Sequence, residues 1–232
     1  MTTPSILIWV VLPYVSIVLF IAGHIWRYRH DQFGWTSRST QLLERRQLAW
    51  GSNLFHFGAL AAIGGHVLGM VIPEQVTSAV GISEYRYHLL SAYAGTIAGL
   101  VCGAGLILLV YRRVTVRRIW VTTSYTDLAV YVLLLILIGL GISETTGVNL
   151  LGGAYDYRAS VAVWFRGIFG FTLYPSLMAR APLLYQVHAA TAWLLFALWP
   201  FSRLVHAWSI PYQYIGRPYI LYRRRYPRTR RS

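Results

Sequence analysis

The sequence lacks lysine entirely, has one cysteine, and carries few charges. Charged residues make up 12% of its 232 positions, whereas soluble globular domains carry about 25%, which argues against a soluble domain. The single cysteine, Cys102, excludes an internal disulfide. No Cys-x-x-Cys-His motif is present, which excludes covalently attached c-type haem. Seven acidic residues against 21 arginines leave a formal net charge of +14.

Long apolar runs account for most of the chain. Apolar residues make up 56% of it and the mean hydropathy is +0.49. A helix of about 20 apolar residues crosses a hydrocarbon layer of about 30 Å, and its backbone satisfies its own hydrogen bonds there. Five segments fit, the fourth being short but extendable back to Val121: Ile6–Trp26, Leu48–Ile72, His88–Tyr111, Asp127–Ile142 and Pro182–Trp208. The sequence therefore predicts an all-α membrane protein with five transmembrane helices in a bundle.

Arginines are concentrated in alternate connections between these segments. Five lie between the first and second, four between the third and fourth, and seven after the fifth. The opposite connections hold Arg86 in one case and Arg158, Arg166 and Arg180 in the other. By the positive-inside rule, the N-terminus is outside and the C-terminus is cytoplasmic.

Two domains follow: a membrane domain, 1–209, and a basic cytoplasmic tail, 210–232, that alternates tyrosine and arginine. We expect the tail to dock onto a cytoplasmic subunit, with anionic lipid as the alternative partner. Nucleic acid is a poor candidate, because these arginines flank apolar runs rather than a soluble scaffold.

Four of the seven histidines lie within two of these segments: His56 and His66 in the second, His188 and His206 in the fifth. Ionisable side chains are costly in a bilayer and suggest function. The two segments run in opposite directions, so depth pairs His66 with His188 near the outside and His56 with His206 near the cytoplasm. Two facing imidazoles suit the axial positions of a haem iron. A zinc site would need further ligands, and no Cys, Asp or Glu stands beside these histidines. The pattern therefore predicts two bis-histidine b haems.

The spacing of these histidines differs between the two segments. In one continuous helix, His188 and His206 would lie on one face, about 27 Å apart along the axis, whereas His56 and His66 would be about 15 Å apart and not on one face. Two straight, parallel helices cannot satisfy both pairs. We expect tilt, different ring orientations or a bend at Pro200 to absorb the difference.

Small and charged residues surround these positions. A glycine cluster in the second segment suggests backbone cleared for a macrocycle: Gly58, Gly64, Gly65 and Gly69. A second series in the third segment indicates close helix packing, with room for a flat cofactor as the alternative: Gly95, Gly99 and Gly103. Arg203 could pair with a haem propionate or snorkel to lipid headgroups.

Other polar and aromatic residues are assigned structural roles. Asp127 follows Ser124 at a helix start, where a carboxylate favours the helix dipole, and Glu144 is interpreted as a solvated helix end. His24 and His30 are expected at the interface. The aromatic stretch 164–171 is either a helix in the interface or an aromatic-belt loop.

Three stretches carry a family resemblance: Ser52-Asn53-Leu54-Phe55-His56, Gly65-His66-Val67-Leu68-Gly69-Met70 and Phe201-Ser202-Arg203-Leu204-Val205-His206. They resemble the gamma subunit of membrane-bound respiratory nitrate reductase, and the similarity extends over nearly the whole chain. The resemblance implies a dihaem cytochrome b in the cytoplasmic membrane. It would oxidise quinol near the outer face and pass electrons inward to an iron–sulfur beta subunit, and then to a molybdenum-containing alpha subunit that reduces nitrate.

The resemblance also implies ligand sets: His66 and His188 for the distal haem, His56 and His206 for the proximal haem. A quinol site would then involve His66, Gly69 and Arg86. The best-known members carry lysine where this chain has Arg86, and a planar guanidinium has a different hydrogen-bond geometry. Tyr85, Tyr87 and His88 are possible neighbours, although an aromatic belt is the preferred interpretation of these residues.

Three alternatives stay open at this point. A related cytochrome b could serve another cytoplasmic module, of the heterodisulfide-reductase or sulfite-reduction type. A nitrite oxidoreductase could run the chemistry in reverse. A transporter or scaffold could use the histidines only for hydrogen bonds between helices.

Overall fold

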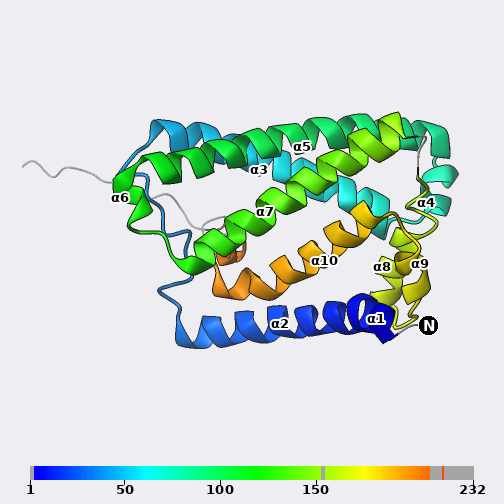
Figure 1. The fold of residues 1–232 in the computed structure, drawn as a ribbon, viewed down its shortest axis with the longest axis horizontal. Helices are drawn as coiled ribbons and strands as arrows, with labels where there is room; N and C mark the ends of the chain where they lie inside the picture. The colour runs from blue at the N-terminus through cyan, green and yellow to red at the C-terminus, as the bar shows by residue number, and fades with distance from the viewer. Residues whose placement is uncertain (1–2, 153–154, 210–215, 217–232) are drawn as a thin grey trace, which may run out of the picture.

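The computed structural model describes residues 3–152, 155–209 and 216, and among these residues it contains helices and no strand. The tail 210–232, to which a partner-docking role was assigned, lies outside the described residues except for Gly216. The long helices form one elongated bundle, and the short helices cover its ends (Figure 1).

Four helical stretches are long and apolar enough to cross a membrane: Thr3–His30, Arg46–Val71, Glu84–Thr115 and Tyr125–Leu151. The first contains α1 (Thr3–Ile6), the π-helical η1 (Leu7–Val11) and α2 (Leu12–His30), and the second contains α3 (Arg46–His66) and the π-helical η2 (Val67–Val71). The third is α5 (Glu84–Thr115), and the fourth joins α7 (Tyr125–Ser143) to the π-helical η3 (Glu144–Leu151). All four overlap the segments predicted from hydropathy.

Side-chain caps set two of these helix starts. Ser83 accepts a hydrogen bond from the backbone N–H of Arg86, so α5 begins before the predicted start at His88. Ser124 and Asp127 form a capping box at the start of α7, in which each side chain accepts a hydrogen bond from the other's backbone N–H. The structural role predicted for Asp127 is therefore confirmed.

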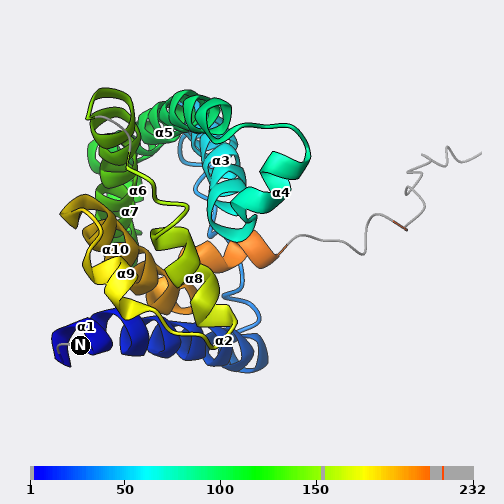
Figure 2. The ribbon, with the colours of Figure 1, turned by 90° about the vertical axis from the view of Figure 1, so that its right-hand side faces the viewer.

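The fifth predicted segment is not one helix. The α-helix α10 (Leu183–Leu198) ends next to Pro200 and is followed by two 3₁₀ turns, η4 (Trp199–Phe201) and η5 (Arg203–Trp208). Ser202 between them is extended, with φ −118° and ψ −179°. Proline lacks a backbone N–H and clashes with the preceding turn, so the helix cannot continue. Figure 2 shows the segment after α10 turning across the bundle instead of continuing along its axis.

Glycines bring neighbouring helices into close contact. A Cβ on Gly58 of α3 would overlap the backbone of Cys102, and one on Gly105 of α5 would overlap the backbone of Phe55. Gly99 faces α7, where a Cβ would lie 2.8 Å from the side chain of Ile142. The glycine series on the third segment therefore serves helix packing, as one of its two interpretations predicted.

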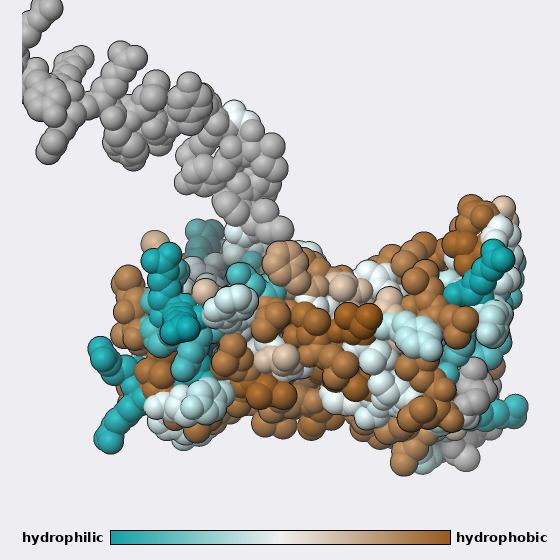
Figure 3. Space-filling model, turned by 90° about the horizontal axis from the view of Figure 1, so that it is seen from above, coloured by the Kyte–Doolittle hydropathy of each residue, from teal (hydrophilic) through white to brown (hydrophobic). Residues whose placement is uncertain are grey.

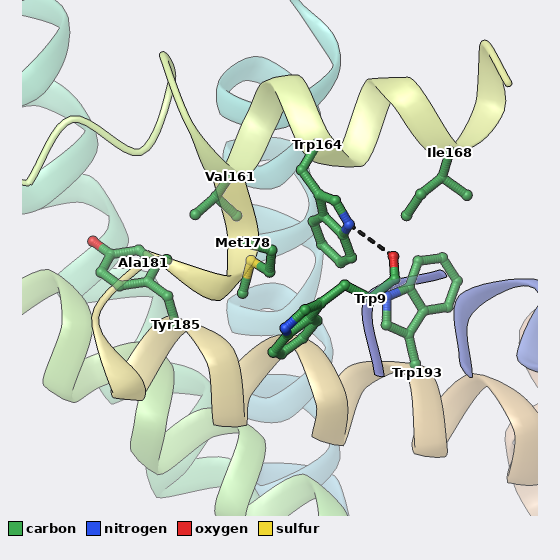
Figure 4. Close-up of a cluster of buried hydrophobic side chains, with 8 residues drawn as sticks. All are labelled: Trp9, Val161, Trp164, Ile168, Met178, Ala181, Tyr185 and Trp193. Atoms are coloured by element: carbon green, nitrogen blue, oxygen red, sulfur yellow. Dashed lines mark hydrogen bonds between the residues drawn. The ribbon is translucent and has the colours of Figure 1, made fainter. Parts of the chain in front are cut away.

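Short helices cover one end of the bundle. Two of them are α8 (Val161–Phe169) and α9 (Pro175–Ala179). They share a buried cluster with η1 and α10, shown in Figure 4. There the indole N–H of Trp164 donates to the backbone oxygen of Trp9 at 2.9 Å, and the two rings meet edge to face. The aromatic stretch is thus a helix anchored to the bundle. The remaining short helices are α4 (Glu74–Ala79) and, at the opposite end, α6 (Arg117–Trp120).

The outer surface is apolar along the middle of the bundle. Figure 3 shows apolar side chains over the central part of one face and hydrophilic side chains towards its two ends. Large apolar side chains that are more than half exposed occur on all four long stretches, among them Val18, Leu60, Ile97, Ile107 and Val132. A surface of this kind is costly in water and suits lipid, which supports a membrane protein.

Candidate functional site

Two histidine pairs lie between α3 and the α10–η5 segment. The ring centres of His66 and His188 are 6.0 Å apart, with an angle of 25° between the ring planes. Those of His56 and His206 are 5.9 Å apart, with an angle of 73°. The structure thus brings together the same partners that depth paired in the sequence.

Backbone carbonyls orient three of these four rings. The Nδ1 atoms of His56 and His66 lie 2.7 Å from the carbonyl oxygens of Ser52 and Ala62, one helical turn earlier. The Nδ1 atom of His206 lies 2.6 Å from the carbonyl oxygen of Arg203. A carbonyl only accepts, so Nδ1 carries the proton in each case and Nε2 keeps its lone pair for a metal.

The geometry of each pair fits one iron between two imidazoles. Imidazole nitrogens bind transition metals at about 2 Å, and rings whose centres are 5.9 and 6.0 Å apart can each direct one nitrogen to a common point between them. No group of three or more metal-ligating side chains occurs among the described residues. The donor set therefore fits an iron that already has four macrocycle nitrogens better than a metal bound by protein ligands alone.

The glycines of the second segment do not share one role. A Cβ on Gly64 or Gly65 would meet no atom within 4 Å, so open space lies next to His66. Gly58 instead packs against Cys102 of α5, and a Cβ on Gly69 would lie 2.7 Å from the Tyr157 hydroxyl. The structure therefore leaves open space at Gly64 and Gly65, while Gly58 serves helix packing.

Two residues of α2 hold the break that positions His206. A Cβ on Gly23 would lie 2.8 Å from the Pro200 ring, so only glycine fits beside this proline without a shift. One turn later, Nη1 of the buried Arg27 donates to the carbonyl oxygens of Pro200 and Ser202 at 2.6 and 2.8 Å. These bonds satisfy carbonyls near the end of the interrupted helix. The bend expected at Pro200 is thus built into the packing against α2.

Arg203 has partners within the chain. Its Nε donates to the Asp127 carboxylate at 2.7 Å, and its two other nitrogens donate to the carbonyl oxygens of Arg38 and Thr122, each at 3.1 Å. Arg203 therefore links η5 to the start of α7 and to the loop after α2. The structure shows no contact that tests the propionate role assigned to it.

Glu144 is not the solvated helix end that the sequence suggested. It is 9% exposed, because the helix continues past Ser143 as η3 and keeps this residue inside the bundle. Its Oε1 lies 3.5 Å from Nδ1 of His188, and neither atom has a hydrogen-bond partner in the part of the chain that the structure describes. His188 is thus the one histidine of the four whose Nδ1 faces a carboxyl group instead of a carbonyl.

One part of the predicted quinol site, Arg86 with its neighbours Tyr87 and His88, lies at the start of α5. Tyr87 and His88 line a cavity of about 240 Å³ whose walls also include Glu84 and Arg158. The guanidinium of Arg158 stacks over the Tyr87 ring at 4.0 Å and pairs with Glu84 at 2.7 Å. The side chain of Arg86 is exposed and is not part of the cavity wall.

Gly69 joins this region to the outer histidine pair. It lies three residues after His66 and is buried against the hydroxyls of Tyr87 and Tyr157, which are 3.4 Å apart. Burial, and then the hydrogen bond to Tyr87, raise the pKa of Tyr157. The Tyr157 hydroxyl can therefore serve as a neutral hydrogen-bond donor beside Gly69.

One protein family matches the chain over nearly its whole length. The family described as "Nitrate reductase gamma subunit" matches residues 5–225. The chain belongs to this family. It is 45% identical to the nitrate reductase gamma chain of Bacillus subtilis over 219 residues, which cover 94% of this chain and 98% of that one. It is 31% identical to the respiratory nitrate reductase 1 gamma chain of Escherichia coli over 218 residues, 93% and 96% of the two chains.

A longer relative is similar over the same region. The chain is 47% identical over 220 residues to the nitrate reductase-like protein NarX of Mycobacterium tuberculosis, and spans 34% of that protein. Together with the four apolar helices, the nitrate reductase gamma family identifies this chain as a membrane subunit of an oxidoreductase complex.

Sequence reasoning missed two residues of this gamma-family site, Arg27 and Glu144. Arg27 was counted only as one positive charge of the first cytoplasmic connection, although its four-residue spacing from Gly23 places both on one face of α2. Glu144 follows an apolar run with Thr145 and Thr146 after it, which resembles a helix end. No clear sequence signal indicates that a helix continues as a π-helix, so the burial of Glu144 could not be predicted from the sequence.

Proposed function

We propose that this gamma-family chain is the membrane cytochrome b subunit of a respiratory nitrate reductase. It would oxidise quinol near the outer face and deliver the electrons to a cytoplasmic iron–sulfur subunit. The observation that carries the proposal is the two pairs of facing histidines, whose ring centres are 5.9 and 6.0 Å apart. Nδ1 contacts to backbone carbonyls leave Nε2 free in three of the four rings. His66 and His188 would hold the outer haem b and His56 and His206 the inner one. Bound there, haem supplies reversible one-electron chemistry.

The quinol end would use residues at the start of α5. Quinol oxidation releases two electrons and two protons for each molecule. The exposed Arg86 guanidinium can donate hydrogen bonds to a quinone oxygen through its planar fork. Gly69 leaves room beside His66 for the hydroxyls of Tyr87 and Tyr157. We therefore assign His66, Gly69 and Arg86 to the quinol site.

The chain would cross the cytoplasmic membrane five times. The 16 residues of α10 span about 24 Å, most of the hydrocarbon thickness of about 30 Å. Arginine distribution places the N-terminus outside and residues 31–45 in the cytoplasm. Quinol would then release its protons outside while its electrons move inward.

The gamma chains that this protein resembles are named as parts of nitrate reductases, which supports partners on the cytoplasmic side. We propose an iron–sulfur beta subunit that docks near the inner histidine pair and a molybdenum-containing alpha subunit that reduces nitrate. The arginine-rich tail would contribute to this contact.

The proposal is tested on the complex purified in detergent. A reduced-minus-oxidised spectrum should show a b-type α band equivalent to two haems per chain. His66→Ala and His56→Ala should each remove one haem. His30→Ala is the matched control, because His30 lies at the end of α2 with its Nδ1 on the Trp26 carbonyl, and it should keep both haems.

A spectrum without a b-type band contradicts the haem assignment and favours a transporter or scaffold. Retention of both haems in His66→Ala contradicts the pairing. Mass spectrometry of the intact complex decides the partner, because copurified subunits of another type would assign the cytochrome to a different module.

A further inference from the structure

The outer histidine His188 differs from the other three in the partner of its Nδ1. His56, His66 and His206 each place Nδ1 within 2.7 Å of a backbone carbonyl of their own helix or turn. The Nδ1 of His188 is buried and has no hydrogen-bond partner among the described residues. A ligating histidine almost always donates its second N–H, because this bond fixes the tautomer and the ring orientation. His188 therefore needs an acceptor that its own helix does not supply.

The acceptor that faces His188 is Glu144. Its Oε1 lies 3.5 Å from Nδ1 of His188, and this oxygen is also buried without a partner. The two side chains are 11% and 15% exposed, so water is largely excluded from both. A buried donor and a buried acceptor that face each other, both unsatisfied, are complementary. A small ring rotation would bring the two atoms to an ordinary hydrogen-bond distance.

Local geometry favours this contact over an accidental one. Gly141 lies one turn before Glu144, and a Cβ at Gly141 would lie 3.1 Å from Cε1 of His188. The absence of a side chain there lets the His188 ring approach the α7–η3 junction. Thr145 and Thr146 donate their hydroxyls to carbonyls of their own helix and do not compete for the ring.

We propose that Glu144 is a positioning residue for the outer haem: it accepts the Nδ1–H of His188, holds the ring in its ligating orientation, and lowers the reduction potential of that haem relative to a site without this bond. The inference rests on the proposed haem function. A carboxyl acceptor makes the imidazole a stronger donor to iron, and a stronger donor favours the ferric form. The inner pair lacks this device, because its Nδ1 atoms contact backbone carbonyls and the Ser52 hydroxyl but no carboxyl group among the described residues.

The test is a potentiometric titration of both haems in the intact complex, followed optically and by electron paramagnetic resonance at one pH. Glu144→Leu removes the acceptor, and at a fixed potential the ferrous-to-ferric ratio of the outer haem should rise about tenfold, which corresponds to about 59 mV. Glu144→Gln keeps a weaker, amide acceptor and should give a smaller rise. The inner haem should not change in either variant.

Thr146→Val is the matched control, since Thr146 lies two residues further on and its hydroxyl donates to the Ile142 carbonyl of its own helix. It should leave both potentials unchanged. Loss of the outer haem from Glu144→Leu with retention in Glu144→Gln also supports the inference. An unchanged outer potential in both Glu144 variants overturns it, and so does loss of the outer haem from both. A wild-type complex without haem would instead refute the proposed function, so the two failures are distinguishable.

Discussion

Glu44 is used twice at the start of α3. Its carboxylate accepts the backbone N–H groups of Gln47 and Leu48 at 2.8 and 3.2 Å, and so caps the helix. The same carboxylate accepts Nε of the buried Arg112 at 2.7 Å, from the end of α5. One acidic residue therefore joins the beginning of one spanning helix to the end of another.

This contact predicts a pH dependence of stability. Desolvation opposes the charged form of Glu44, but the bonds from Gln47, Arg112 and Leu48 outweigh it and lower the pKa of this carboxyl. A pKa that is lower in the folded state than in the unfolded state stabilises the protein above the unfolded value, and this contribution is lost as pH falls through the folded value. Glu44→Gln should therefore lower Tm at pH 7, and the difference from wild type should shrink on acidification. Tryptophan fluorescence during heating measures both; a difference independent of pH would contradict the assignment.

Substitution of two glycines of α3, Gly65 and Gly58, should have opposite effects on haem content and stability. Gly65 faces open space, so Gly65→Leu should cause no clash between helices but occupy the space proposed for the outer macrocycle and reduce outer haem content. Its Tm should fall only by the stabilisation that the lost haem supplied. Gly58 contacts the backbone of Cys102, so Gly58→Leu should separate α3 from α5 and lower stability by about 3 kcal/mol or more. Haem content and thermal unfolding of the two variants separate these effects. A destabilised Gly65→Leu protein with full haem content would contradict the first prediction.

At the scale of elements, α10 and η5 depend on α2 for their relative placement. Arg27→Ala removes two hydrogen bonds to the carbonyls around Pro200 and leaves them unsatisfied, at a cost of about 2 kcal/mol. Because η5 carries His206, we expect the inner haem to be lost more readily than the outer one. The amounts of inner and outer haem that remain after dilution into detergent measure this difference. Arg29→Ala, which alters an exposed arginine of the same helix, is the control; equal loss of both haems would contradict the prediction.

Element boundaries show what hydropathy could and could not predict. The existence of the long helices and the pairing of the histidines followed from apolar runs and depth, since lipid restricts the backbone to helices. The buried state of Glu144 and the hydrogen bonds of Arg27 did not follow, because they depend on tertiary contacts. Arg112, Arg113 and Arg158 were likewise interpreted as loop charges, yet they are 2%, 6% and 4% exposed. A count of basic residues does not distinguish a solvated arginine from one that ties helices together.

At the scale of the whole molecule, orientation is the prediction with the largest functional consequence, because it sets the direction of electron flow. In a Cys102→Ala background, a reporter at Val80→Cys should react with a membrane-impermeant maleimide in intact spheroplasts. Gln41→Cys should react only after the membrane is opened. Both positions are exposed in the structure. The reverse pattern would invert the proposed topology and place quinol oxidation on the other side.

Because the helix is interrupted at Pro200, the two segments that carry the histidines differ in rigidity. On one side, His56 and His66 belong to a single uninterrupted helix, which fixes their separation along its axis at about 15 Å. On the other side, His188 and His206 belong to separate pieces joined at an extended residue, each of which can adjust to its own partner. The uninterrupted helix α3 therefore sets the distance between the two proposed haems. The segment from α10 to η5 can change its shape without changing that distance. Substitutions in α10 should therefore tune one centre at a time, whereas an inserted or deleted residue between His56 and His66 would disturb both.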